Sequence, residues 1–207
     1  MRPSLLLSTI ALASTLSAQA NTLLGESFDS VAGLTGTGWL LVNQSTPAGS
    51  TGWFQGNNGV FTAQAGADNA YVAANFLNAG DGGAVSNWLI TPAISGTGSL
   101  ALSFFARTGG ALPGDTLEVR YGAGADPSAF TALLGTVTPG AAWSAVSFTA
   151  SAVVGGRFAL RYVVADTSVG GDYIGIDTLS VAAVPEPTSL ALLAVGLAVI
   201  GLRRRAA

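Results

Sequence analysis

Apolar and polar residues alternate along several short segments of this chain, and the alternation restricts the possible folds more than any other feature. It is clearest in residues 98–107, where Leu100, Leu102, Phe104 and Ala106 share one side of an extended strand. Residues 115–121 repeat the pattern with Leu117 inside and Arg120 outside, and residues 157–164 repeat it with Leu160 inside and Arg161 outside. A half-buried β-strand has this period of two, because successive side chains point to opposite faces of a sheet.

Glycine-rich turns separate these strands at short intervals. They are predicted at residues 57–59, 78–83, 108–110, 122–124, 138–140 and 155–156. Further strands are predicted at residues 23–28, 38–42, 59–64, 69–75, 84–91, 130–137, 143–149 and 173–181. No stretch before residue 188 shows a sustained helical repeat. Residues 21–182 are therefore predicted to form one all-β domain, a jelly-roll β-sandwich.

Three residue types with versatile chemistry are missing from the chain. Its 207 residues include no cysteine, histidine or lysine, so all eight basic residues are arginines. Disulfides, a histidine-based hydrolytic triad and a P-loop lysine are thereby excluded. Residues 21–182 hold ten acidic residues against four arginines, a formal charge of −6, which disfavours nucleic acid as a partner.

The N-terminus is typical of a secretory signal peptide. Arg2 supplies a positive start, residues 5–16 are mostly apolar, and Ala18-Gln19-Ala20 offers small residues for cleavage. We therefore predict a signal peptide over residues 1–20 and an exported mature chain.

The C-terminus, residues 183–207, has three features in a fixed order. Val184-Pro185-Glu186-Pro187 comes first, an apolar run then predicts a helix over residues 188–202, and Arg203, Arg204 and Arg205 follow. Such a helix is about 22 Å long, so a membrane span needs snorkelling arginines or a thinned bilayer. Length alone would favour a buried core helix, but the arginines and the glycine and alanine content favour a membrane segment whose arginines stay in the cytoplasm.

This tail closely resembles the PEP-CTERM sorting signal of exported bacterial proteins. The resemblance implies that an exosortase, a membrane protease, recognises the tail and cuts near the Pro-Glu-Pro motif. The helix would then anchor the protein in the inner membrane only transiently. The expected final location is the cell surface or the extracellular space.

A second resemblance spans nearly all of residues 23–182. Six segments carry it in order: residues 26–29, 52–54, 86–92, 102–107, 115–119 and 173–177. The Asn-Trp-Leu-Ile-Thr-Pro element at 87–92 and the Gly-Ile-Asp element at 175–177 are its most specific parts. The segments are similar to the choice-of-anchor J domain, which is itself similar to MAM and cleaved-adhesin jelly rolls. The resemblance implies an exported β-sandwich joined to a surface anchor, and it implies no catalytic activity.

Carboxylates are the candidate metal ligands, because Ca²⁺ prefers oxygen ligands and the chain lacks softer ones. Glu26 and Asp29 end the first predicted strand, and Asp177 lies where the apolar positions of the last strand change parity. That change predicts a β-bulge. The first and last strands of similar jelly rolls are neighbours, so Glu26, Asp29 and Asp177 are predicted to converge on one calcium ion. The alternative is that Asp177 caps a turn or accepts backbone amides.

Four tryptophans, Trp39, Trp53, Trp88 and Trp143, are available for stacking on glycans or for the core. Trp88 lies inside an apolar run and is expected in the core. Trp53, which Phe54 follows between Gly52 and Gly56, is the best candidate for an exposed ligand-binding aromatic, with core packing as the alternative.

Two functions of different classes follow from these features. The favoured one is a non-enzymatic surface or matrix protein, a binding or structural β-sandwich with extracellular polysaccharide as a partner. The alternative is a carbohydrate-active enzyme that uses two of the ten carboxylates.

Overall fold

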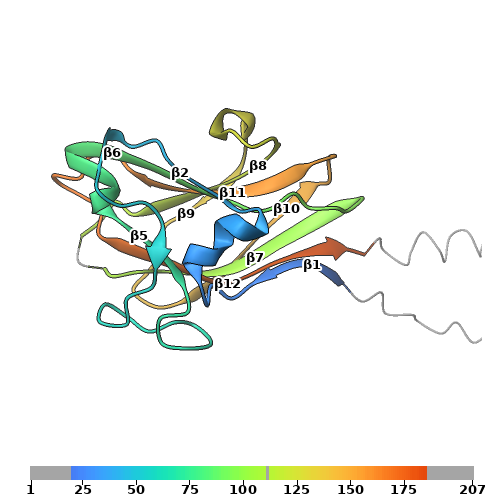
Figure 1. The fold of residues 1–207 in the computed structure, drawn as a ribbon, viewed down its shortest axis with the longest axis horizontal. Coiled ribbons are helices and arrows are strands. Elements are labelled where there is room, and N and C mark those ends of the chain that lie inside the picture. The colour runs from blue at the N-terminus through green and yellow to red at the C-terminus, as the bar shows by residue number, and fades with distance from the viewer. Residues whose placement is uncertain (1–19, 111, 186–207) are drawn as a thin grey trace, which may run out of the picture. The chain divides into compact units, whose positions relative to one another are not determined.

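Two antiparallel β-sheets pack face to face in the computed structural model, which describes residues 20–110 and 112–185 (Figure 1). Sheet A has the strand order β10–β7–β12–β5–β4, and β1 pairs with β12. Sheet B has the order β2–β6–β11–β8–β9, and β3 pairs with β6. The predicted jelly-roll β-sandwich is confirmed, and residues Ala20–Val184 form one compact unit.

The bounds of the elements are as follows. Sheet A contains β1 (Asn21–Glu26), β4 (Phe54–Gln55), β5 (Val72–Asn75), β7 (Ser99–Thr108), β10 (Ser144–Ser151) and β12 (Tyr173–Val184). Sheet B contains β2 (Leu40–Asn43), β3 (Thr46–Ala48), β6 (Ala79–Ile90), β8 (Thr116–Ala123), β9 (Ala132–Val137) and β11 (Gly156–Val164). Three short 3₁₀ helices join them, η1 (Val31–Thr37), η2 (Phe76–Asn78) and η3 (Pro127–Ala129).

The core lies between the sheets and contains the side chains that the alternation predicted. Leu100, Leu102 and Phe104 of β7 are buried there, and so are Leu117 of β8 and Leu160 of β11. Within the described ranges, no helix is long and apolar enough to cross a membrane. The predicted helix 188–202 and nearly all of the predicted signal peptide lie outside those ranges.

The predicted turn at residues 78–83 is wrong, because most of this segment forms the start of β6. Thr46 and Ala48 of β3 pair with Ala84 and Ala79 of β6. The glycines that suggested a turn allow this close approach instead. A Cβ atom at Gly80 would lie 2.9 Å from Cγ of Pro47, so a larger residue would push the strands apart.

The predicted strand at residues 59–64 is also wrong, because these residues belong to a loop over the outer face of sheet A. We call residues 56–70, between β4 and β5, the covering loop. Its Phe61 is 5% exposed and packs on Tyr71 and Tyr173. The apolar positions that suggested a strand therefore anchor an irregular loop.

Candidate functional site

The predicted bulge in the last strand is confirmed at Asp177 and Thr178. The pairing of β12 with β7 shifts register between Asp177 and Ser180. Thr178 has a φ of +49°, in the left-handed region that β-branched residues rarely adopt. Ile174 and Ile176 precede this point in the core and Leu179 follows it, so the bulge explains the change of parity.

Asp177 is 0% exposed and fastens the covering loop to sheet A. Its Oδ2 accepts hydrogen bonds from the backbone N–H groups of Gln64 at 2.7 Å and Ala65 at 3.1 Å. Its Oδ1 accepts from the N–H of Thr178 at 2.6 Å and the hydroxyl of Thr178 at 3.3 Å. Burial raises the pKa of Asp177 above its ordinary value, although these hydrogen bonds act in the opposite direction.

Glu26 and Asp29 are engaged locally. Phe28, which also has a positive φ of 55°, donates its N–H to Oε1 of Glu26 at 2.8 Å. The Ser27 hydroxyl donates to Oδ2 of Asp29 at 2.8 Å. Across residues 20–110 and 112–185, no three acidic side chains form a group that could hold a metal ion. The donors around Asp177 do not fit a calcium ion shared with Glu26 and Asp29, and calcium binding stays a prediction.

The expectation of an exposed Trp53 is wrong. Trp53 is only 7% exposed and packs in the main core with Val31 and Leu34 of η1. Phe54, the next residue, is half-buried with its ring edge-on to Tyr173 at 5.8 Å between centroids. The flanking glycines suggested an open turn, but a local motif does not reveal that residues of η1 join Trp53 in the same core cluster.

Aromatic side chains also fill the space under the covering loop. The centroid of the Phe61 ring lies 5.0 Å from that of Tyr71 and 5.4 Å from that of Trp143. The Cζ atom of Arg107 lies 4.4 Å from the Phe61 centroid. The Trp143 Nε1–H donates to the Thr62 carbonyl at 2.9 Å. Burial raises the pKa of both the Tyr71 and Tyr173 hydroxyls, which share a hydrogen bond at 3.1 Å. These aromatics hold the loop and are not a free stacking platform.

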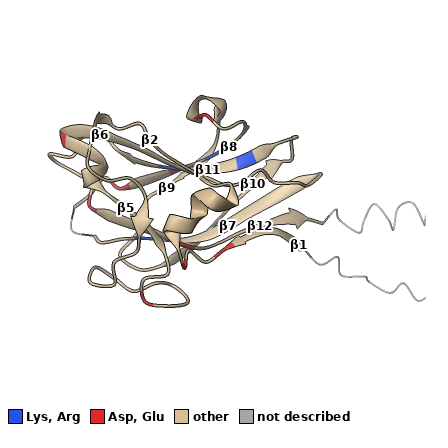
Figure 2. Cartoon of the chain, in the orientation of Figure 1, with Lys and Arg blue, Asp and Glu red and all other residues tan. Residues whose placement is uncertain are grey.

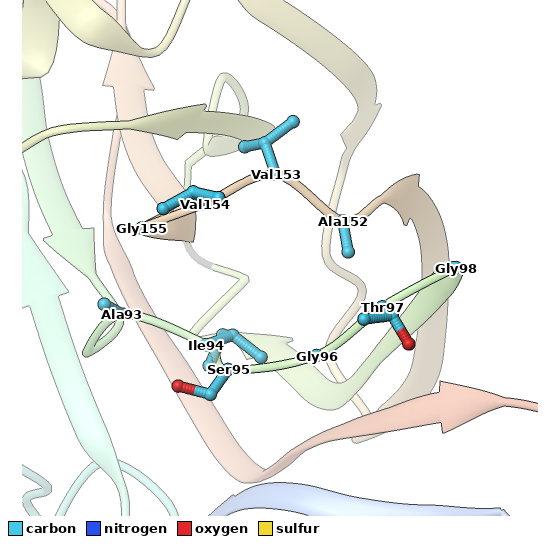
Figure 3. A pocket seen from close by; sticks show the side chains of 10 residues that line it. All are labelled: Ala93, Ile94, Ser95, Gly96, Thr97, Gly98, Ala152, Val153, Val154 and Gly155. Atoms are coloured by element: carbon cyan, nitrogen blue, oxygen red, sulfur yellow. The ribbon is translucent and has the colours of Figure 1, made fainter.

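A pocket of about 480 Å³ lies at one end of the sandwich, between residues 93–98 and residues 152–155 (Figure 3). Aliphatic side chains and glycines line most of it, and only Ser95 and Thr97 present side-chain oxygens. Val154 on its rim is fully exposed. The pocket offers few groups that could fix the orientation of a ligand.

A different pocket, of about 330 Å³, opens on the outer face of sheet B, and we call it the arginine pocket. It is lined by Gln44, Trp88, Arg120, Pro127, Ser128, Phe130, Thr131 and Arg161. The register of the strands brings the central residues of this site together, because Arg161 of β11 pairs with Trp88 of β6 on one side and with Glu118 of β8 on the other. Trp88 is 6% exposed, as expected, but it packs with Phe130 outside the sandwich core.

Glu118 holds the two arginines in place. Its Oε2 accepts from Nε of Arg120 at 2.8 Å and from Nη1 of Arg161 at 3.2 Å. Arg161 also donates from Nε to the Ser86 hydroxyl at 2.9 Å, and its guanidinium lies 5.2 Å from the Trp88 ring centroid. Burial alone would raise the pKa of Glu118, but the two arginines outweigh it and lower that pKa.

Positive charge is concentrated on this face of the domain. Alternation along β8 and β11 places Arg120, Arg157 and Arg161 on the outer face of sheet B, where they are three of the four arginines in residues 21–182. Figure 2 shows how few positions are charged at all. The sequence placed Arg120 and Arg161 outside, but not beside Trp88, because a single strand does not reveal its neighbours in a sheet.

Neither of the two pockets just described contains a pair of carboxylates. No acidic side chain lines the pocket between residues 93–98 and 152–155, and none lines the arginine pocket. Asp115 is buried and accepts hydroxyl hydrogen bonds from Thr108 and Tyr162, both at 2.6 Å. Two carboxylates poised around a glycosidic bond are therefore not found at these places.

Comparison with known proteins identifies the tail. The family described as "PEP-CTERM protein-sorting motif" matches residues 183–205. This match indicates an exported protein that is sorted to the cell surface. The matched segment begins at the last two residues of the β-sandwich domain. No curated protein matches the chain.

Solved structures that share the fold of this domain include cleaved adhesin domains. The K1 cleaved adhesin domain of Lys-gingipain from Porphyromonas gingivalis W83 is 20% identical, with a TM-score of 0.62 over 78% of this chain and 98% of that one. The K3 cleaved adhesin domain of Lys-gingipain from the same strain is 16% identical, with a TM-score of 0.53 over 77% of this chain and 98% of that one. At these identities the similarity shows the fold alone.

Proposed function

We propose that this chain is the precursor of a non-enzymatic surface or matrix protein whose β-sandwich, of the choice-of-anchor J type, binds extracellular polysaccharide. The PEP-CTERM match, which begins at the last two residues of β12, carries the proposal, since it joins an export signal directly to this domain. The cleaved-adhesin-like fold supports a binding role, and the lack of histidine, cysteine and lysine argues against the common catalytic mechanisms.

In this proposal the signal peptide, residues 1–20, is removed on export. The tail then holds the protein in the inner membrane until an exosortase-type protease cuts near Val184-Pro185-Glu186-Pro187. Arg203, Arg204 and Arg205 keep the end of the tail in the cytoplasm, consistent with the positive-inside rule.

Intact-mass spectrometry of protein recovered from the cell surface tests the processing. We expect a product that lacks residues 1–20 and ends close to the Pro-Glu-Pro motif. A variant with Pro185→Ala and Pro187→Ala should keep its tail, whereas the control Thr188→Ala should be processed normally. Recovery of wild-type protein with Arg203–Arg205 still attached would reduce the tail to a simple anchor.

Incubation of the secreted protein with neutral and acidic polysaccharides tests the binding role. Retention on a polysaccharide without release of reducing ends supports the proposal. Release of reducing ends that a single Asp→Asn change abolishes would replace it with the carbohydrate-active enzyme.

A further inference from the structure

The arginine pocket differs in charge from the domain that contains it. Residues 21–182 carry a formal charge of −6, whereas two guanidinium groups and no carboxylate line the pocket. Glu118 pairs with both guanidinium groups but is not one of the lining residues. The pocket therefore favours an anionic group, and the acidic remainder of the domain disfavours anions elsewhere.

The two guanidinium groups are held so that each keeps free donors. Arg120 is fixed through Nε by Glu118 and through Nη1 by the Phe130 carbonyl at 3.1 Å. Arg161 is fixed through Nε by Ser86 and through Nη1 by Glu118. In the described part of the chain, neither Nη2 group has a hydrogen-bond partner, and the side chains remain 19% and 27% exposed. Fixed guanidinium groups with free N–H donors match the planar geometry of a carboxylate.

The rest of the lining suits a sugar ring. Gln44, Ser128 and Thr131 are exposed at the rim and offer an amide and two hydroxyls to sugar hydroxyl groups. Trp88 and Phe130 give the pocket an apolar wall. Its volume of about 330 Å³ lies at the lower end of the range for small-molecule sites.

We propose that the arginine pocket binds a carboxylate-bearing sugar unit, such as a uronic acid residue of an acidic extracellular polysaccharide. Arg120 and Arg161 bind the carboxylate through their free N–H groups, and the rim groups bind the ring hydroxyls. This inference rests on the proposed function and gives it a site and a ligand class.

Isothermal titration of the secreted protein with trigalacturonate and with neutral galactotriose tests the ligand class. We expect trigalacturonate to bind about tenfold more tightly or better, because hydrogen bonds between charged groups are stronger than neutral ones. Its affinity should fall as salt is added. Equal affinity for both trisaccharides would overturn the carboxylate assignment.

Matched variants test the site. Thr131→Glu adds a negative charge at an exposed rim position and should weaken trigalacturonate binding about tenfold or more. Thr149→Glu adds the same charge at an exposed position of β10 in sheet A, outside the pocket, and should bind as the wild type does. Arg161→Gln should lose binding. Arg157→Gln should retain it, because Arg157 is on the same face but donates to the Gly38 and Thr91 carbonyls outside the pocket. Unchanged binding by both Thr131→Glu and Arg161→Gln would overturn the pocket.

The proposed function and the arginine pocket are tested separately. If polysaccharides are retained but these variants have no effect, the proposed function stands and the arginine pocket does not. If no polysaccharide or trisaccharide binds, both are overturned.

Discussion

Replacing Asp177 with asparagine should release the covering loop from sheet A and destabilise the domain. The Oδ2 atom accepts from the N–H groups of Gln64 and Ala65, and Oδ1 accepts from Thr178. An asparagine has one oxygen and one NH₂ group, so one side of this arrangement must place a donor against donors. Each N–H left without an acceptor costs about 1–3 kcal/mol when it is buried.

The expected cost of Asp177→Asn is about 2–3 kcal/mol, since in either orientation of the amide at least one backbone N–H group loses its acceptor and faces the NH₂ group. For a domain of this size, each kcal/mol lowers Tm by about 2–4 °C, so a fall of about 4–12 °C is expected. Thermal unfolding of the secreted protein measures it. Hydrogen exchange should also accelerate at Gln64 and Ala65.

Asp81→Asn is the matched control, because Asp81 is an exposed aspartate on β6. It should change the free energy of unfolding by no more than about 0.5 kcal/mol. Wild-type Tm in Asp177→Asn, together with unchanged exchange at Gln64 and Ala65, would refute the view that Asp177 holds the loop.

Three further predictions follow from the described contacts. Gly175→Ala should destabilise the domain by about 1–3 kcal/mol, because the new Cβ atom would lie 2.9 Å from atoms of Phe61, Tyr71 and Trp143. The control Gly25→Ala should be neutral, because its Cβ atom would have no neighbour within 4 Å. Equal melting temperatures for the two variants would contradict this packing. The pKa of Glu118 is lowered in the folded state, so its ion pairs should stabilise the domain fully above the unfolded-state pKa of about 4.3 and lose that contribution as the pH falls through the folded-state pKa. Glu118→Gln should therefore flatten the acid side of a plot of Tm against pH. A plot unchanged from that of the wild type would contradict this prediction. Melting curves in calcium and in chelator should coincide if N–H donors occupy Asp177 as described, whereas a higher Tm in calcium that Asp29→Asn removes would restore the ion site.

Strand identity could be read from the sequence wherever one face of a strand is buried in the core. The period of two is imposed by the core, so Leu100, Leu117 and Leu160 were all placed correctly. The prediction of a strand at residues 59–64 and that of a turn at residues 78–83 were wrong, because local composition does not decide the structure there. Phe61 is apolar because it anchors a loop on the outer face of sheet A, and Gly80 is a glycine because Pro47 of another strand lies against it.

The candidate site was less accessible to sequence reasoning. The bulge at Asp177 could be predicted, because a change of parity is a property of one strand. The partners of Asp177 could not, since Gln64 and Ala65 are more than a hundred residues away in the chain. The arginine pocket depends on the register of β6, β11 and β8, which is set by pairing between strands and not by any one of them.

The position of β12 has a mechanical consequence. The tail begins where β12 ends, and near this end Val181 pairs with Leu24 of β1 on one side and with Leu102 of β7 on the other. A pulling force applied at Val184 along β12 would therefore load the hydrogen bonds to both neighbours in shear, many at once. We expect a high rupture force in single-molecule extension when the force acts between Val184 and the opposite sheet. Gradual peeling at low force would contradict this expectation. A domain held at this point and loaded at the site proposed on the opposite sheet would transmit tension across the sandwich without unzipping from its end.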